Sequence, residues 1–155
     1  MIPTPTYIEN HKLVLDAFGC WPSFHDAEIQ SITMDCTSML ATAPINNVRL
    51  EMMIHCWELT NELNEKGFYK LRKHHSVRFE FDMIHEVTLK NFGQQNCVYY
   101  ITFEEIPVEK GKHHLFKVIL DSSSNSEYAF HGEFTAFAGR VLSVTPYSPA
   151  DDSSP

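Results

Sequence analysis

The residues whose types and spacing suggest chemistry lie in one short segment, from Trp21 to Glu28. This segment contains an imidazole and two carboxylates, on His25, Asp26 and Glu28. Such groups are the usual general acids and bases of enzymes, and they also ligate metal ions. One interpretation of the segment is therefore a small metal-dependent or acid-base active site, which His55 would extend.

A structural role is the other interpretation, and the expected backbone favours it. Neighbouring side chains of an extended strand point to opposite faces, so His25 and Asp26 would need a turn to converge on one ion. Trp21 and Phe24 offer large apolar surfaces that can anchor a corner to a core. Pro22 restricts the backbone between them. We therefore predict a structural motif of Trp21, Pro22, Phe24, His25 and Asp26, in which His25 is buried and hydrogen-bonded.

The rest of the chain lacks the common signatures of catalysis and of cofactor binding. It has no phosphate-binding glycine loop, no Gly-x-Ser-x-Gly segment and no His-Glu-x-x-His pair. The His pairs at 74–75 and 113–114 are sequence neighbours whose side chains should face apart. The four cysteines contain no Cys-x-x-Cys pair, and we expect them to be reduced and mostly buried. We predict no catalytic residues, no metal site and no cofactor.

The segment from Phe18 to Ile29, Phe-Gly-Cys-Trp-Pro-Ser-Phe-His-Asp-Ala-Glu-Ile, resembles the opening of the immunity protein 50 family of bacterial polymorphic toxin systems. Three later segments, 77–81, 87–92 and 95–98, are compatible with the pattern of that family. The resemblance implies a non-catalytic protein that binds and neutralises a cognate toxin domain. It implies no catalytic residues and does not indicate the contact residues.

One helix is expected before this segment, and Gly19 is expected to end it. Apolar residues recur every three or four positions from Ile8 to Phe18, which is the spacing of an amphipathic helix. Thr6 and Glu9 have the spacing of a capping box that would start it. The apolar side of this helix should lie on a sheet.

After the segment the apolar period changes to two, which indicates strands. A β-bulge near Gln30 and Ser31 would reconcile the two phases of the first strand. Residues 37–47 are expected to form a loop with a turn, and residues 58–74 a long hairpin loop or a short helix. Gly132 is expected to be a bulge or a point of close packing. The expected strands are 27–34, 48–57, 77–83, 87–91, 99–103, 116–120, 128–136 and 141–144.

This order of elements predicts an α+β, mainly β fold with one N-terminal helix on a curved antiparallel sheet of about seven or eight strands. Short turns favour antiparallel pairing. The sheet would form an open barrel or a sandwich. A barrel with an internal apolar cavity would allow a third function, the binding of a small ligand. We expect a single domain over residues 1–147 and a flexible tail over 148–155.

Composition places limits on the partners. Of the 155 residues, 43% are hydrophobic, which suits a folded core rather than a disordered chain. The formal net charge of −8 disfavours nucleic acid and is compatible with a basic protein partner. The sequence shows no signal segment and no membrane-spanning stretch, so we expect a cytoplasmic protein. A homodimer is compatible with these features.

Overall fold

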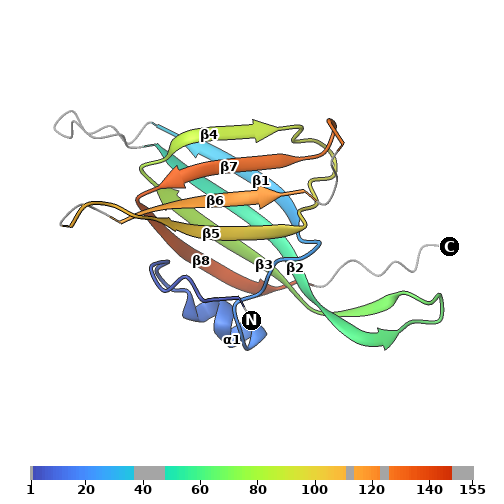
Figure 1. Ribbon diagram of the computed structural model, residues 1–155. Helices are drawn as coiled ribbons and strands as arrows, with labels where there is room; N and C mark the ends of the chain where they lie inside the picture. The colour runs from blue at the N-terminus through green and yellow to red at the C-terminus, as the bar shows by residue number, and fades with distance from the viewer. Residues whose placement is uncertain (1, 37–47, 111–113, 123–125, 148–155) are drawn as a thin grey trace.

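The computed structural model describes residues 2–36, 48–110, 114–122 and 126–147 (Figure 1). The predicted loop at 37–47 and the predicted flexible tail at 148–155 lie outside these ranges. Within them, no helix is long and apolar enough to cross a membrane. The elements in chain order are α1 (Lys12–Phe18), β1 (Glu28–Asp35), β2 (Arg49–Leu63), β3 (Tyr69–Asp82), β4 (His85–Lys90), β5 (Tyr100–Ile106), β6 (Leu115–Asp121), β7 (His131–Ala136) and β8 (Ala138–Pro146).

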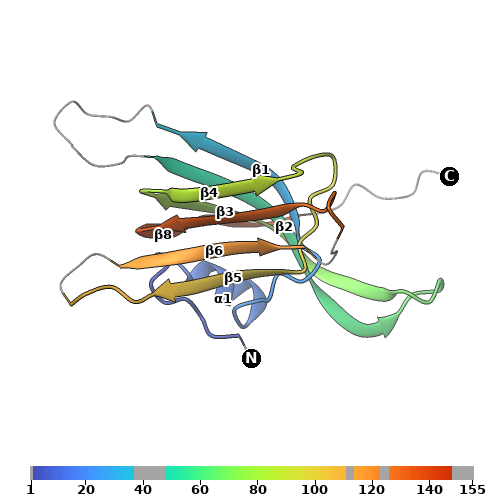
Figure 2. The same ribbon diagram turned by 45° about the horizontal axis from the view of Figure 1, so that its top comes forward.

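The strands form two four-stranded antiparallel sheets, with the orders β1-β2-β3-β8 and β4-β7-β6-β5 (Figures 1 and 2). The mainly β, antiparallel prediction is confirmed. The sheets are not closed into a barrel, so the barrel alternative is wrong. The chain leaves the first sheet after β3, where Met83 has a left-handed backbone with a φ of 54°. It returns to that sheet as β8.

The core lies between the two sheets and is rich in phenylalanine. Phe79 and Phe81 of β3 are fully buried, as their alternation with Glu80 predicts. The Phe81 ring contacts Phe134 of β7 and Phe116 of β6, at centroid distances of 5.0 and 6.1 Å. These contacts join the inner faces of the two sheets, so side chains fill the interior that a ligand-binding barrel would need.

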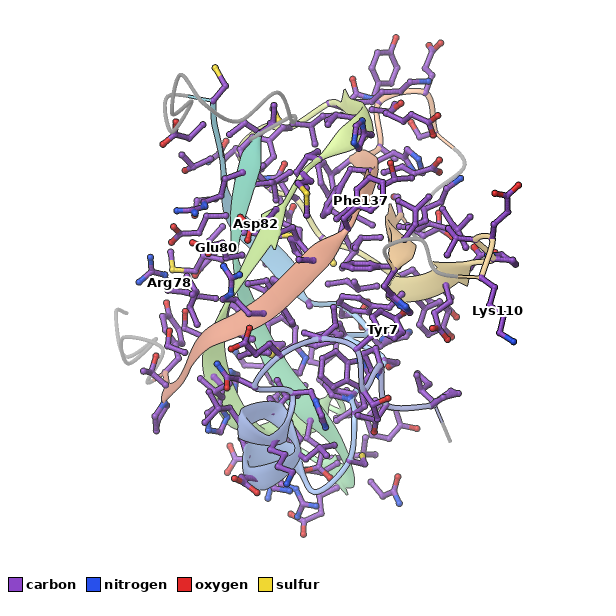
Figure 3. All side chains as sticks on the ribbon, turned by 90° about the vertical axis from the view of Figure 1, so that its left-hand side faces the viewer. Tyr7, Arg78, Glu80, Asp82, Lys110 and Phe137 are labelled. Atoms are coloured by element: carbon purple, nitrogen blue, oxygen red, sulfur yellow. The ribbon has the colours of Figure 1, made fainter. Side chains whose placement is uncertain are left out.

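The outer face of the first sheet carries ion pairs. Arg140 of β8 donates hydrogen bonds to Glu80 and to Asp82, whose Oδ2 is 2.8 Å from Nη2. Arg78 pairs with Glu51 on the neighbouring strand β2, and Figure 3 shows it on the side of the sheet away from the core. This part of the sheet is therefore polar outside and apolar inside, as an antiparallel sheet with one solvated face should be.

The helix is shorter than predicted, with seven residues instead of about three turns. His11 stands at its N-cap and no side chain caps it, so the capping box from Thr6 to Glu9 is wrong. Glu9 instead pairs with β8, where its N–H donates to the Gly139 carbonyl at 2.9 Å. Gly19 ends the helix in a left-handed conformation with a φ of 81°, as predicted.

The prediction for residues 58–74 is wrong in its extent and in its helical alternative. Both strands of the β2–β3 hairpin continue through most of this segment, and the turn spans only residues 64–68. Leu59 pairs with Leu71 and Leu63 with Tyr69. The distal hairpin extends beyond the two sheets (Figures 1 and 2).

Two smaller predictions are confirmed. The register of β1 against β2 shifts between Ile29 and Ser31, where a bulge was expected. Gly132 is a point of close packing rather than a bulge, because a Cβ atom there would lie 2.9 Å from Leu120 Cδ1.

The cysteines are free where described, but Cys20 and Cys36 are exposed, so the expectation of mostly buried thiols is wrong.

Candidate functional site

The segment from Trp21 to Glu28 forms the corner between α1 and β1. Its backbone is strained, because Phe24 and Asp26 have φ angles of 58° and 60°. Positive φ is rare for residues other than glycine and is unfavourable for a bulky side chain. The surrounding contacts must therefore hold this conformation in place.

Two aromatic side chains supply those contacts. Trp21 and Phe24 are 3% and 2% exposed. The Trp21 ring lies edge-on to Phe24, to Phe79 of β3 and to Phe103 of β5, at centroid distances of 5.9, 6.2 and 5.5 Å. The corner thus packs against strands of both sheets. This burial is what a structural role requires.

His25 and Asp26 do not face apart, and that expectation is wrong. The left-handed backbone on either side of His25 makes a turn, so its Nδ1 lies 2.9 Å from Asp26 Oδ2. The prediction that His25 is buried is wrong, because 39% of its side chain is exposed beside the Asp26 carboxylate. Its ring lies 4.6 Å from that of Tyr99. A carboxylate on Nδ1 would fix the tautomer with a free Nε2, which is the arrangement of a general base.

The segment before β5 holds the other side of the corner. Ile29 N–H donates to the Asn96 carbonyl and Val98 N–H to the Ala27 carbonyl, at 3.0 and 2.9 Å. The Asn96 side chain is buried and donates to the carbonyls of Ile29 and Gly93. No local pattern marks Asn96 for this role, because its partner Ile29 is 67 positions away in the chain.

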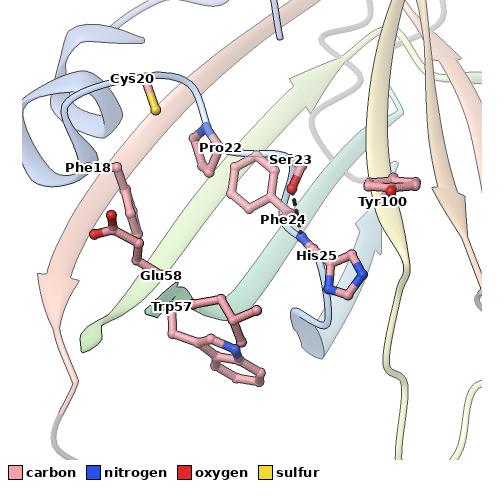
Figure 4. A pocket seen from close by; sticks show the side chains of 10 residues that line it. Phe18, Cys20, Pro22, Ser23, Phe24, His25, Trp57, Glu58 and Tyr100 are labelled. Atoms are coloured by element: carbon pink, nitrogen blue, oxygen red, sulfur yellow. Dashed lines mark hydrogen bonds between the residues drawn. The ribbon is translucent and has the colours of Figure 1, made fainter. Parts of the chain in front are cut away.

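A cleft of about 390 Å³ opens beside the corner (Figure 4). The corner forms one wall, and the base of the β2–β3 hairpin with Tyr100 completes it. Its polar groups include the His25 imidazole and the Ser23 hydroxyl, which accepts a 3.3 Å hydrogen bond from the His25 backbone N–H. The lining residues are Phe18, Cys20, Pro22, Ser23, Phe24, His25, Trp57, Glu58, Leu59 and Tyr100.

Glu58 is a poor acid-base group for this cleft. Hydrogen bonds from Arg72 and Lys73 lower the pKa of its carboxyl to about 2. A general acid or base works best with a pKa near the working pH. Glu58 is therefore an ionised partner of two cations, so the His25 imidazole is the better candidate for an acid-base group in the cleft.

A second imidazole cluster lies at the base of the hairpin. His55 Nε2 is 3.2 Å from His74 Nδ1, and the His55 ring also contacts Trp57 and Tyr147. Burial, and then the neighbouring imidazole, lowers the pKa of His55; burial, and then His75, lowers that of His74. The sequence contained only a weak sign of this cluster, because a bulge at Lys73 determines which histidine faces His55.

The residues of the proposed metal cluster do not converge. Glu28 lies opposite His55 on β2, and His25 contacts Asp26 in the turn, so the four residues form two pairs and not one cluster. In the parts of the chain that the structure describes, no three His, Cys, Asp or Glu side chains are placed to hold a metal ion. His113 lies outside those parts, and His114 pairs with Glu105.

The chain matches no known protein in three comparisons. No model of a known protein family matches the chain, and neither a curated protein nor a solved structure does.

Proposed function

We propose that this protein is a non-catalytic immunity protein that binds and neutralises a cognate toxin domain in the cytoplasm. The observation that carries the proposal is the corner from Phe18 to Ile29. Its sequence resembles that family, and its apolar side chains pack between strands of both sheets. A family motif of this kind specifies a scaffold, while the binding surface varies with the partner.

Charge supports a basic toxin as the partner. Residues 58–73 contain three Glu and four Lys or Arg, a net charge of +1, so the remainder of the chain carries −9. An acidic body attracts a basic domain at long range and repels nucleic acid. Association with the toxin should therefore weaken as the salt concentration rises.

Co-expression with the cognate toxin domain tests the proposal. We expect cells to survive when the two proteins are made together and to die when the toxin is made alone. The purified proteins should form a complex of defined stoichiometry. Cell death despite abundant, folded immunity protein would contradict the proposal.

A small acid-base enzyme is the second candidate, because His25, whose Nδ1 contacts the Asp26 carboxylate, lines an open cleft. Asp26→Asn separates the two candidates. It removes the carboxylate that orients His25 and would reduce general-base catalysis by orders of magnitude. An immunity protein with this substitution should still protect cells fully if it remains folded. Loss of protection without loss of folding would favour the enzyme.

A further inference from the structure

The distal β2–β3 hairpin, residues 58–73 and here called the arm, packs on neither sheet. β1 pairs with β2 only as far as His55, and β8 pairs with β3 only as far as His75. Beyond these points the arm has two strands and projects away from the body (Figures 1 and 2). A two-stranded hairpin is at best marginally stable in water on its own. An ordered arm therefore needs support from its own side chains or from a partner.

The arm has one ionic face. Glu58 and Arg72 are directly paired, and two hydrogen bonds of 3.2 and 3.0 Å join their side chains. Lys70 lies two residues from Arg72 on the same side of β3, and its Nζ is 3.4 Å from Glu62. These contacts neutralise most of the charge on this face.

The opposite face is apolar and open to solvent. Directly paired residues share a face of a sheet, which places Leu59 with Leu71 and Leu63 with Tyr69. Leu71 and Tyr69 are two residues apart on β3, so all four side chains lie on one side. The exposed fractions of these side chains are 52% for Leu59, 40% for Leu71, 56% for Leu63 and 55% for Tyr69. The largest apolar patch on a monomer usually measures a few hundred Å² and is often functional, and larger patches mark contacts with other molecules.

We infer that this apolar face is covered by the same face of a second copy of the chain. A row of leucine and tyrosine side chains is complementary to itself, as a two-fold symmetric interface requires. The arm carries a net charge of only +1, whereas the remainder of the chain carries −9. Two copies that meet through their arms hold the mutually repelling acidic bodies apart.

The area is sufficient for a weak, specific dimer. Four half-exposed large side chains each leave roughly 100 Å² uncovered, and the adjoining Trp57 adds a smaller share. Each copy would bury roughly 500 Å², or about 1,000 Å² for the pair, which is the lower limit for a specific interface. We therefore expect a dimer that dissociates on dilution, with a Kd in the micromolar range.

Sedimentation equilibrium of the purified protein alone, over a wide concentration series, tests this inference. We expect the mass to rise from one chain to two. Leu71→Ser should remove the dimer or raise its Kd at least tenfold, whereas Lys70→Ser, the adjacent residue on the ionic face, should leave the Kd nearly unchanged. Near-ultraviolet circular dichroism checks that both variants are folded.

A second variant keeps the test decisive if Leu71→Ser does not fold. In it, residues 59–71 are replaced by a two-residue turn, which retains the strand pairing within the first sheet. This variant should stay monomeric. A wild-type protein that is monomeric throughout the series would overturn the inference, and so would a dimer that survives in Leu71→Ser or in the variant with the shortened arm. Toxin protection is measured separately, so failure here would not affect the proposed function.

Discussion

At the scale of single residues, the corner balances local strain against burial. The positive φ angles of Phe24 and Asp26 are unfavourable by themselves. Burial of Trp21 and Phe24 among Phe79 and Phe103 offsets this cost. The corner should therefore contribute more to stability than its length suggests, and its aromatic anchors should be the most sensitive positions.

Trp21→Ala should lower the free energy of unfolding by about 3–5 kcal/mol, the usual cost of losing a large buried aromatic side chain. Chemical denaturation measures this value. Tyr128→Ala is the matched control, because that ring is 80% exposed and its loss should cost less than about 0.5 kcal/mol. Similar losses in the two variants would mean that Trp21 does not anchor the core.

His25→Ala should have a small effect on stability, because its side chain and that of Asp26 are 39% and 45% exposed. Solvent-exposed ion pairs contribute about 0–1 kcal/mol, so we expect a loss in that range. Toxin protection should be retained. Unchanged stability together with loss of protection would show that the corner is a functional site and not only a structural one.

At the scale of elements, Gly139 is where three parts of the fold meet. Its carbonyl accepts from Glu9 N–H, which attaches the N-terminal segment to β8. A Cβ atom there would lie 2.9 Å from both Ile8 Cδ1 and Phe81 Cδ1, and 3.1 Å from Phe116 Cζ. These side chains are fully buried and have little room to move, so only a glycine allows the segment and both sheets to approach so closely.

Gly139→Ala should therefore destabilise the protein by about 1–3 kcal/mol through overpacking. Thermal unfolding would show this as a lower Tm. Gly93→Ala is the control, because the nearest atom to its added Cβ is Asn91 O at 3.8 Å. If Gly139→Ala melts with the wild type, the N-terminal segment is less tightly packed on β8 than the structure shows.

At the scale of the whole molecule, the His55–His74 cluster should make stability depend on pH. Burial lowers the pKa of both imidazoles below the ordinary value of 6.5, so the folded state favours their neutral forms. Below that pH the unfolded chain binds more protons than the folded one. The stability that the neutral His55 and His74 contribute is fully present above the pKa that these imidazoles have in the unfolded chain. It is lost as the pH falls below that value.

The double variant His55→Gln/His74→Gln should therefore lose less stability than the wild type when the pH falls from about 8 to about 5. Urea unfolding at several pH values measures the difference in slope. Parallel curves for the double variant and the wild type would show that the cluster does not contribute to acid sensitivity.

The sequence by itself determined the local features of this protein. The alternation in β2 and β3, the glycine that ends α1, the bulge after Ile29 and the burial of Trp21 and Phe24 follow from side-chain period and backbone preference. The contact between His25 and Asp26 could not be predicted, because it depends on left-handed residues that only the surrounding packing can hold.

Only the tertiary structure decided how the strands divide between two sheets and what lies beside the corner. Strand periodicity is the same in one sheet or in two, so the crossing after β3 leaves no mark in the apolar pattern. The cleft, the His55–His74 contact and the buried Asn96 join residues far apart in the chain. The arm was missed because exposed strands lack the alternation that burial imposes, and its open apolar face becomes visible only when the register pairs Leu59 with Leu71.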